Sequence, residues 1–206
     1  MLLVGLTGSI AMGKSVASRI LRRERIPVHD ADAAVHALMS RDGAAVAALE
    51  AAFPGCVRDG AADRSALRQR ISGDDEAKRR LEAIIHPLVR VATRRFVARH
   101  ARARRSAVVL DIPLLYETGA QRRLDAVIVV SAPSWLQRAR FLQRPGMTPE
   151  LLAAFLAWQV PDREKRRRAD ACATSALGRA RTRRDLLAAL RAIPAVRGRV
   201  WKPGWK

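Results

Sequence analysis

Cysteine is scarce in this sequence of 206 residues. Cys56 and Cys172 are its two cysteines, and their spacing fits neither a metal site nor a redox motif. Reduced thiols in a cytoplasmic protein are the plain interpretation. No uninterrupted apolar run approaches the ~18 residues that a transmembrane helix needs, so no membrane span is expected. The first residues lead straight into a strand pattern, and we therefore expect no signal peptide.

Acidic and aromatic residues are also few. The chain has 19 Asp and Glu against 39 Lys and Arg, a formal net charge of +20. Such a surplus predicts a polyanionic partner, either nucleic acid or a phosphorylated small molecule. The alternative is a GC-rich coding bias that enriches alanine and arginine. With one Tyr and four Phe, the chain is poorly supplied for stacking single-stranded bases, which argues against nucleic acid.

The strongest pattern present is the segment 8–15, Gly-Ser-Ile-Ala-Met-Gly-Lys-Ser, which fits G-x-x-x-x-G-K-[ST]. An apolar run over residues 2–6 precedes it and predicts a buried strand, while residues 16–21 have helical spacing. Strand, loop and helix in this order are the context that a phosphate-binding loop requires. The alternative is a glycine turn followed by a chance Lys-Ser pair, and the context favours the phosphate loop.

The residue types of this loop suit a nucleoside triphosphate. Gly8 and Gly13 can take backbone angles that a Cβ would forbid, so successive N–H groups can face a phosphate. The positive end of the following helix adds to the attraction. Lys14 is predicted to reach the outer phosphates, and the Ser15 hydroxyl to ligate Mg²⁺. The predicted nucleotide contacts of the loop are Gly8, Ala11, Met12, Gly13, Lys14, Ser15 and Val16.

Carboxylates stand at the ends of two further predicted strands. Residues 25–29 resemble a second strand that ends at Asp30-Ala31-Asp32, and residues 107–115 a third that contains Asp111. At strand ends in an open α/β sheet, one carboxylate can accept the proton of an attacking hydroxyl and another can hold Mg²⁺. The alternatives are that Asp32 caps a helix over residues 33–39 and that Asp111 is tied to local backbone.

Residues 33 to about 100 are mostly helical in pattern, which predicts a helical insertion that covers the active site. The expected helices span residues 44–53, 64–72, 76–85 and 88–99. Pro87 biases His86 toward an extended conformation, so the third of these helices should end there.

Several basic side chains of this region are candidates for substrate binding. Arg64, Arg68 and Arg90 could bind substrate phosphates, and the alternative for each is a solvated surface charge. His86 is either a structural histidine or a substrate contact. We assign Asp30, Arg64, His86 and Arg90 to the predicted substrate-binding set.

The remaining third of the chain completes an α/β pattern. Residues 124–130 form a continuous β-branched run, typical of a parallel strand covered on both faces. Residues 169–173 are a weaker fifth strand, and residues 182–192 a last helix. Residues 161–168 form a charge run, which we expect to be a solvated helix face.

A basic helix is expected over residues 134–146. Arg140 and Arg144 share one of its faces at a spacing of four. Guanidinium groups bind phosphate oxygens through paired hydrogen bonds, so these two arginines could close over a transferring phosphoryl group. The alternative is an ordinary basic surface.

With these motifs in place, the sequence resembles the dephospho-CoA kinase family up to about residue 190. The matching residues are Gly5-Leu6-Thr7-Gly8 with the loop to Ser15, Asp30-Ala31-Asp32, Asp63-Arg64 with Leu67, Leu81-Glu82, His86-Pro87, Asp111-Ile112-Pro113-Leu114-Leu115 with Glu117, Gln137-Arg138 with Arg140 and Arg144, Gln159, and Glu164-Lys165 with Ala169-Asp170. The loop alone is shared by many nucleotide enzymes, whereas the ordered set is far more selective.

The resemblance implies transfer of the ATP γ-phosphoryl group to the ribose 3′-hydroxyl of dephospho-CoA in the cytoplasm. It implies a three-layer phosphate-loop fold, a five-stranded parallel sheet with helices on both faces. The single domain would have a core of residues 1–32 and 101–195, a CoA-binding insertion of about 33–100 and a lid of about 135–168. The tail of residues 196–206 has no counterpart that we can place in the family, and we expect it to be flexible or to pack on a neighbour. We expect a monomer or weak homo-oligomer.

The resemblance also implies roles for individual residues. Asp32 would be the base, Lys14 and Arg140 would stabilise charge on the transferred group, and Arg144 would be a second lid arginine. Ser15 would hold Mg²⁺, assisted by Asp111 at its strand end.

Four residues depart from the family's pattern. Glycines are usual where this chain has Ser9 and Ala11, and Ala11 should be unstrained only at negative φ. Ser175, with Thr174, stands where many members have an asparagine near the adenine.

Two other functions compete with this one. The phosphate loop is compatible with another nucleoside or nucleotide kinase, although the His-Pro and Pro-Leu-Leu-Tyr-Glu elements argue against it. The basic charge is compatible with an RNA-binding NTPase.

Overall fold

The structure, a computed structural model, describes residues 1–194. The tail predicted at 196–206 lies outside the described residues. The chain divides into two compact units. The first consists of Met1–His29 and the residues from His100 onward, and the second is Asp30–Arg99.

A five-stranded sheet forms the centre of the first unit, in the order β2-β5-β1-β6-β7. β1 is paired in parallel with β5 and β6, and β7 continues the sheet beyond β6 in parallel. The strands are β1 (Leu2–Thr7), β2 (Val28–Asp30), β5 (Ala107–Asp111), β6 (Ala126–Ser131) and β7 (Ala171–Thr174). The predicted five-stranded α/β sheet is confirmed, including the weak fifth strand.

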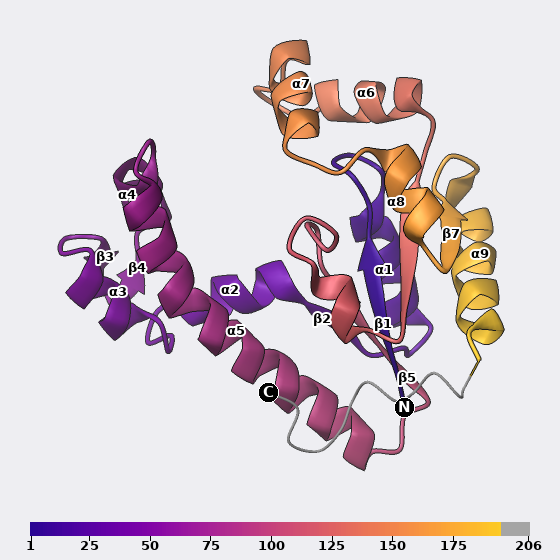
Figure 1. Cartoon of the computed structure of the whole chain (residues 1–206), viewed down its shortest axis with the longest axis horizontal. Helices are drawn as coiled ribbons and strands as arrows, with labels where there is room; N and C mark the ends of the chain where they lie inside the picture. The colour runs from indigo at the N-terminus through magenta and orange to yellow at the C-terminus, as the bar shows by residue number, and fades with distance from the viewer. Residues whose placement is uncertain (195–206) are drawn as a thin grey trace. The chain divides into compact units, whose positions relative to one another are not determined.

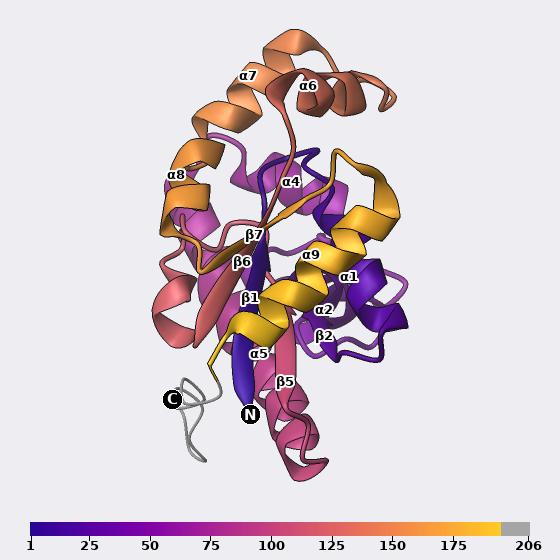
Figure 2. The same ribbon diagram turned by 90° about the vertical axis from the view of Figure 1, so that its right-hand side faces the viewer.

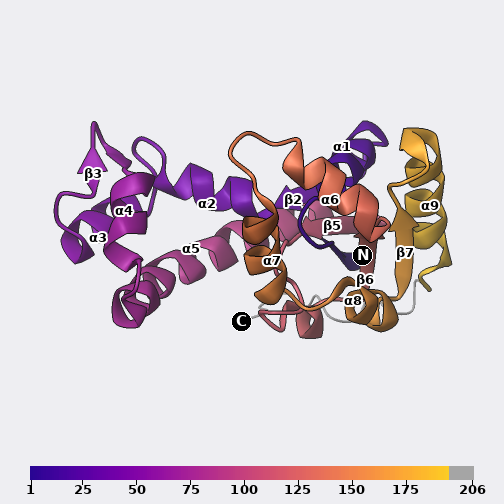
Figure 3. The ribbon, with the colours of Figure 1, turned by 90° about the horizontal axis from the view of Figure 1, so that it is seen from above.

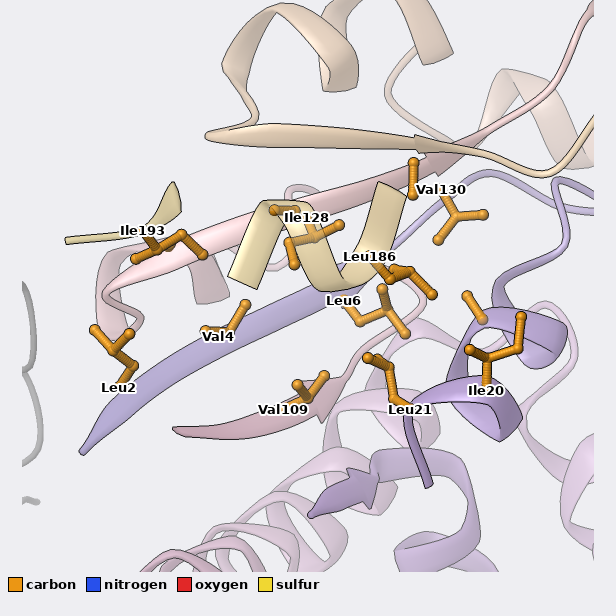
Figure 4. Packing of buried hydrophobic residues seen from close by; sticks show 14 residues of the cluster. Leu2, Val4, Leu6, Ile20, Leu21, Val109, Ile128, Val130, Leu186 and Ile193 are labelled. Atoms are coloured by element: carbon orange, nitrogen blue, oxygen red, sulfur yellow. The ribbon is translucent and has the colours of Figure 1, made fainter. Parts of the chain in front are cut away.

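One face of this sheet is covered by α1 (Lys14–Arg23) and α9 (Gly178–Ala192). Figure 4 shows side chains of this cluster: Leu6 of β1 lies near Leu21 of α1 and Leu186 of α9, and Val4 lies further back along β1. α9 begins four residues before the predicted 182. Because β1 presents alternate apolar residues to both faces, its continuous apolar sequence indicates a central strand.

The opposite face is covered by the loop after β5 and by α8 (Asp162–Arg168). A Cβ on Gly5 would lie 2.6 Å from a methyl of Leu115, so the loop packs directly on β1. Figure 2 shows α8 on one side of the strands and α1 and α9 on the other. The predicted solvated charge run is therefore wrong at Lys165, whose side chain is fully buried and lies 2.9 Å from Glu117 Oε1.

Two helices lie beyond the carboxyl end of β1, namely α6 (Ser134–Leu142) and α7 (Pro149–Ala157). Figures 1 and 3 show them on the same side as the loop that joins β1 to α1. Thr148 begins α7 by accepting a hydrogen bond from the Leu151 N–H. A short 3-10 helix, η1 (Ala120–Arg123), precedes β6.

The second unit is helical, with one short hairpin. Its helices are α2 (Ala31–Met39), α3 (Val46–Ala52), α4 (Arg64–Ile71) and α5 (Asp75–Arg102), and its hairpin joins β3 (Val57–Arg58) to β4 (Ala61–Ala62). Asp59 and Gly60 turn the hairpin with φ of 50° and 75°, two positive values of the kind that Asp-Gly hairpin turns require. Met39, Leu49, Phe53 and Ile85 form its core.

The predicted helix end at His86 is wrong. α5 runs through Pro87 without interruption. Proline removes one N–H from the helix and restricts the preceding residue. Ile84, Ile85, Leu88 and Val89 flank it on both sides and all pack against the core of the second unit. Their burial offsets the lost hydrogen bond, which is a tertiary contribution that local sequence rules omit.

Candidate active site

The predicted phosphate loop joins the carboxyl end of β1 to α1. Gly13, the residue before α1, has φ of +91°, a left-handed conformation that glycine adopts without steric cost. The carbonyl of Gly13 then accepts hydrogen bonds from Val16 N–H and Ala17 N–H and starts the helix. The N-terminus of α1 therefore faces the loop with its unpaired N–H groups, the arrangement that binds phosphate.

Gly8 is needed for a different reason from the one expected. A Cβ at this position would lie 2.5 Å from the carbonyl oxygen of Val130 on the neighbouring strand β6. The requirement at Gly8 is therefore close approach between two backbones, whereas the requirement at Gly13 is a positive φ. Together they fix both ends of the loop.

Ala11 has φ of +59°, so the sequence condition for an unstrained alanine is not met. A left-handed conformation costs a residue with a Cβ roughly 1–2 kcal/mol. The Ala11 methyl is buried in a small cluster with Phe141 of α6 and Leu152 of α7. Burial of one methyl contributes about 0.8 kcal/mol, which offsets much of that strain.

Lys14 and Asp111 meet beside the loop. Lys14 Nζ lies 2.6 Å from Asp111 Oδ1, and the carboxylate is 2% exposed at the end of β5. The sequence alternative of an Asp111 held by local backbone is thus replaced by an ion pair between the end of β5 and the start of α1. Nearby, Thr7 Oγ1 donates to the carbonyl of Pro113 and ties the end of β1 to the turn after β5.

Ser15 and Asp111 are the two predicted magnesium ligands. Ser15 lies in the first turn of α1 and is exposed, and Asp111 is the buried partner of Lys14. Mg²⁺ is usually held by one or two protein oxygens together with substrate phosphates and water. A hydroxyl and a carboxylate beside a phosphate loop fit that requirement. No cluster of three or more His, Cys, Asp or Glu side chains suited to a metal ion occurs within residues 1–194.

Arg140 of α6 reaches the loop through Ser175. Its Nη1 donates to Ser175 Oγ at 2.7 Å, and its Nη2 donates to the Ser175 carbonyl at 2.8 Å. Ser175 Oγ in turn donates to the carbonyl of Met12 at 2.8 Å. Ser175 therefore joins Arg140 of α6 to the phosphate loop. Sequence reasoning missed this role and saw in Ser175 only a departure from the family's usual asparagine.

Arg144 is exposed and follows the end of α6, where its N–H donates to the carbonyl of Phe141. Its role toward nucleotide stays a prediction. Gln137 and Gln159 both contact the backbone of Ile10 within the loop. Both glutamines stood in the set that carried the family resemblance, but no feature of the sequence assigned them a partner.

Asp30, and not Asp32, caps α2. Asp30 Oδ1 accepts a hydrogen bond from Ala33 N–H at 3.0 Å, and the helix begins at Ala31. The alternative that Asp32 caps a helix over 33–39 is therefore wrong, because Asp32 already lies in the first helical turn.

The other predicted substrate-binding residues lie on helices of the second unit. Arg64 is the first residue of α4, and the Asp63 side chain caps this helix. His86 and Arg90 are four residues apart on α5 and so share a face. Their assignment to substrate remains a prediction.

The structure thus brings together the predicted phosphate loop, Lys14, Asp111 and Arg140 within the first unit. Within residues 1–194 no helix combines the length and apolar character that crossing a membrane requires. Cys56 and Cys172 both lack a disulfide.

Comparisons with known proteins agree on one family. A family model described as Dephospho-CoA kinase matches residues 2–176. The dephospho-CoA kinase of Paramagnetospirillum magneticum is 63% identical over 166 residues, which cover 81% of this chain and 78% of that protein. The dephospho-CoA kinase of Mesorhizobium japonicum is 57% identical over 170 residues, 82% of this chain and 85% of that protein.

Two solved structures agree with these relatives. Protein TT1252 from Thermus thermophilus aligns with a TM-score of 0.78 and 34% identity, over 93% of this chain and 96% of that one. A dephospho-CoA kinase from Campylobacter jejuni aligns with a TM-score of 0.63 and 25% identity, over the same shares of the two chains. Since the family model covers most of the sequence, this chain belongs to the dephospho-CoA kinase family.

Proposed function

We propose that this protein transfers the γ-phosphoryl group of ATP to the ribose 3′-hydroxyl of dephospho-CoA, giving coenzyme A and ADP. Membership of the family supports the acceptor. The observation that carries the chemistry is the meeting of Lys14, Asp111 and Arg140 around one phosphate loop. Phosphoryl transfer depends on positioning and on stabilisation of charge, and these groups supply both.

Different groups around the loop bind different parts of the ATP triphosphate. Backbone N–H groups of the loop and of the N-terminus of α1 bind the β- and γ-phosphates, as expected of such loops. Lys14 neutralises charge on the outer phosphates as a point charge on a flexible stem. Arg140 adds a planar guanidinium with two parallel donors, which suits the equatorial oxygens of the transferring group. Arg144, just beyond the end of α6, is a second arginine for the same phosphates.

Magnesium is the metal that this donor set fits. Ser15 and Asp111 would hold it together with phosphate oxygens, and when bound it neutralises charge that develops on the phosphates. The pairing of the buried Asp111 carboxylate with the Lys14 ammonium group supports this assignment, because the carboxylate already has a positive charge beside it.

Asp32 is proposed as the base that accepts the proton of the attacking 3′-hydroxyl. Two observations support it: Asp32 follows the carboxyl end of β2, and the capping of α2 is performed by Asp30 instead. Helix capping therefore does not explain why an aspartate occupies position 32. Asp30, Arg64, His86 and Arg90, all in the second unit, are proposed to bind the acceptor, whose phosphates suit arginine.

A panel of acceptors tests this proposal. The purified full-length chain is incubated with ATP and Mg²⁺ and either dephospho-CoA, nucleoside monophosphates or RNA. We expect phosphorylation of dephospho-CoA with kcat/KM at least 100-fold above the other acceptors. Preference for a nucleoside monophosphate would favour a nucleotide kinase, and steeply salt-dependent RNA binding without phosphoryl transfer would favour an RNA-binding NTPase.

The remaining proposals concern the protein's cellular location and oligomeric state. The absence of disulfides at Cys56 and Cys172 supports a cytoplasmic location. We further expect a monomer or weak homo-oligomer.

A further inference from the structure

Two glutamine side chains hold the backbone of Ile10 from opposite ends of the α6–α7 region. Gln137 Nε2 donates to the Ile10 carbonyl at 2.8 Å, and the Ile10 N–H donates to Gln159 Oε1 at 3.1 Å. Gln137 belongs to α6 and is 5% exposed, while Gln159 follows α7. Ile10 is the third residue of the phosphate loop, and neither contact is explained by catalysis as described above.

The α6–α7 region also contacts the loop through apolar side chains, and a hydrogen bond joins the two ends of the region. Ile10 and Ala11 pack with Phe141, Leu152 and Met147 in one cluster. At the base, Ser131 Oγ donates to Asp162 Oδ2 at 2.7 Å, which joins the chain before α6 to the chain after α7. The two helices are therefore held to the rest of the first unit at both ends.

Because of peptide geometry, these contacts limit which N–H groups of the loop can bind phosphate. In a trans peptide the C=O and the N–H point to opposite sides. Because Gln137 holds the Ile10 carbonyl, the N–H of Ala11, on the same peptide, must point away from Gln137. Because Gln159 accepts from the Ile10 N–H, that donor is withdrawn from phosphate. The two glutamines thus determine which loop N–H groups can face a nucleotide.

We propose that Gln137 and Gln159 are positioning residues that orient the peptides on either side of Ile10 and so preorganise the loop for ATP. The inference deepens the proposed function and rests on it only in taking ATP as the nucleotide. It requires a donor at position 137 and an acceptor at position 159, because the two amides play opposite roles. Preorganisation lowers the cost of ordering the loop when the ligand binds.

The test uses substitutions that separate donor from acceptor. Gln137→Met and Gln159→Met remove each contact at nearly constant volume, and Gln137→Glu and Gln159→Glu keep only an acceptor. Gln143→Met is the matched control, because Gln143 is an exposed glutamine at the end of the same helix α6. Hydrogen exchange of the peptide that contains Ile10 is measured by mass spectrometry on the full-length, nucleotide-free protein.

We expect faster exchange in Gln137→Met, Gln137→Glu and Gln159→Met, and wild-type exchange in Gln159→Glu and Gln143→Met. Rescue by glutamate at 159 but not at 137 is the signature of the donor and acceptor pattern. Equal behaviour of the two glutamate variants, or unchanged exchange in both methionine variants, would overturn the proposal.

Equilibrium titration with ATP measures the consequence for binding. The two methionine variants should raise the ATP Kd about tenfold, and kcat at saturating ATP should stay within about threefold of wild type, as expected for lost ground-state binding. A purely structural role would lower thermal stability and leave Kd unchanged, which would contradict the proposal. The exchange and titration need no acceptor, so a failure of dephospho-CoA phosphorylation would be distinguishable from a failure of this inference.

Discussion

Lys14 Nζ and Asp111 Oδ1 lie 2.6 Å apart, with the carboxylate almost fully buried at the end of β5. Lys14, the residue proposed to bind the outer phosphates of ATP, therefore already has a negatively charged partner within the protein. Before Lys14 can bind phosphate, this internal partner must be shared or replaced. On the proposed roles, phosphate would compete with Asp111 for Lys14, and Mg²⁺ would compete with Lys14 for Asp111.

Asp111→Asn tests this competition. Removal of the carboxylate frees Lys14 and removes a negative charge next to the phosphates, so ATP without Mg²⁺ should bind about three- to tenfold more tightly. Because the proposed metal ligand is lost, kcat should fall at least tenfold and the Mg²⁺ concentration for half-maximal rate should rise. Titrations of ATP with and without Mg²⁺ measure both effects. Weaker Mg²⁺-free ATP binding in the variant would contradict the account.

Arg140→Lys should separate charge from geometry at α6. Lysine keeps the positive charge but cannot make the two parallel hydrogen bonds that Arg140 Nη1 and Nη2 make to Ser175. We expect kcat to fall about 100-fold, within the range seen when transition-state donors are removed, with the KM for dephospho-CoA nearly unchanged. Steady-state kinetics with both substrates varied is the measurement. Arg138→Lys, on an exposed arginine of the same helix, is the control.

Ser175→Ala should have a smaller effect at the same place. The substitution leaves the Met12 carbonyl without its side-chain donor and removes one of the two contacts to Arg140, while the Ser175 carbonyl remains. A lost hydrogen bond of this kind costs about 1 kcal/mol, so kcat should fall about fivefold. Activity equal to wild type would show that Ser175 does not position Arg140.

Glu117 and Lys165 supply a pH-dependent part of the stability. Burial alone would raise the pKa of Glu117, but the hydrogen bonds from Lys165 and from Val160 N–H outweigh it and hold the pKa below its usual 4.5. A carboxyl whose folded pKa is lowered stabilises the fold above its unfolded pKa and loses that contribution as pH falls through the folded pKa. The contribution should therefore be present in full at neutral pH and be lost progressively as pH falls below 4.5.

Glu117→Gln should lower the free energy of unfolding by about 3–5 kcal/mol at pH 7, since it leaves the fully buried Lys165 without a charge partner. Lys165→Met should cost less, because an apolar side chain of similar volume fills the space and Glu117 keeps the Val160 N–H. Urea unfolding at pH 7 and near pH 4 measures both. A difference between wild type and Glu117→Gln that stayed constant on acidification would refute this assignment.

Ala11→Gly should change stability little, because relief of the positive φ and loss of a buried methyl oppose each other. We expect a change in the free energy of unfolding below about 1 kcal/mol. Ala17→Gly is the control: Ala17 is fully buried in the interior of α1, so the substitution loses a methyl and helix propensity together and should cost roughly 2 kcal/mol. Equal losses at the two positions would show that Ala11 is not strained.

The sheet and the phosphate loop were predictable because both depend on local pattern. A continuous apolar run followed by two glycines and Lys-Ser specifies a strand, a turn and a helix start within twenty residues. Pro87 shows the limit of such reasoning: its local preference is opposed by apolar contacts with residues over thirty positions away in the sequence. The aspartates at 30 and 32 correctly indicated where the second strand ends and a helix begins. Which of the two side chains caps α2 could be decided only from the three-dimensional structure.

The contacts that support the site were not predictable for a similar reason. Lys165 stands in a run of charged residues, and its burial depends on Glu117, 48 positions earlier. Gln137 and Ser175 are ordinary polar residues whose partners, Ile10 and Met12, are backbone carbonyls more than 120 positions away. Every residue has a backbone carbonyl, so the sequence does not indicate which carbonyl such a side chain will contact.

The most direct test of the central claim follows the phosphoryl group itself. ATP labelled at the γ-phosphate is mixed with dephospho-CoA, Mg²⁺ and the purified full-length chain, and the product is examined by ³¹P NMR and mass spectrometry, with Asp32→Asn in parallel. The account predicts one new phosphomonoester on the ribose 3′-oxygen for the wild type. It predicts a rate at least 100-fold lower for Asp32→Asn, with ATP binding nearly intact. Label that remains in ATP or appears only as inorganic phosphate with the wild type, or full activity in Asp32→Asn, would contradict it.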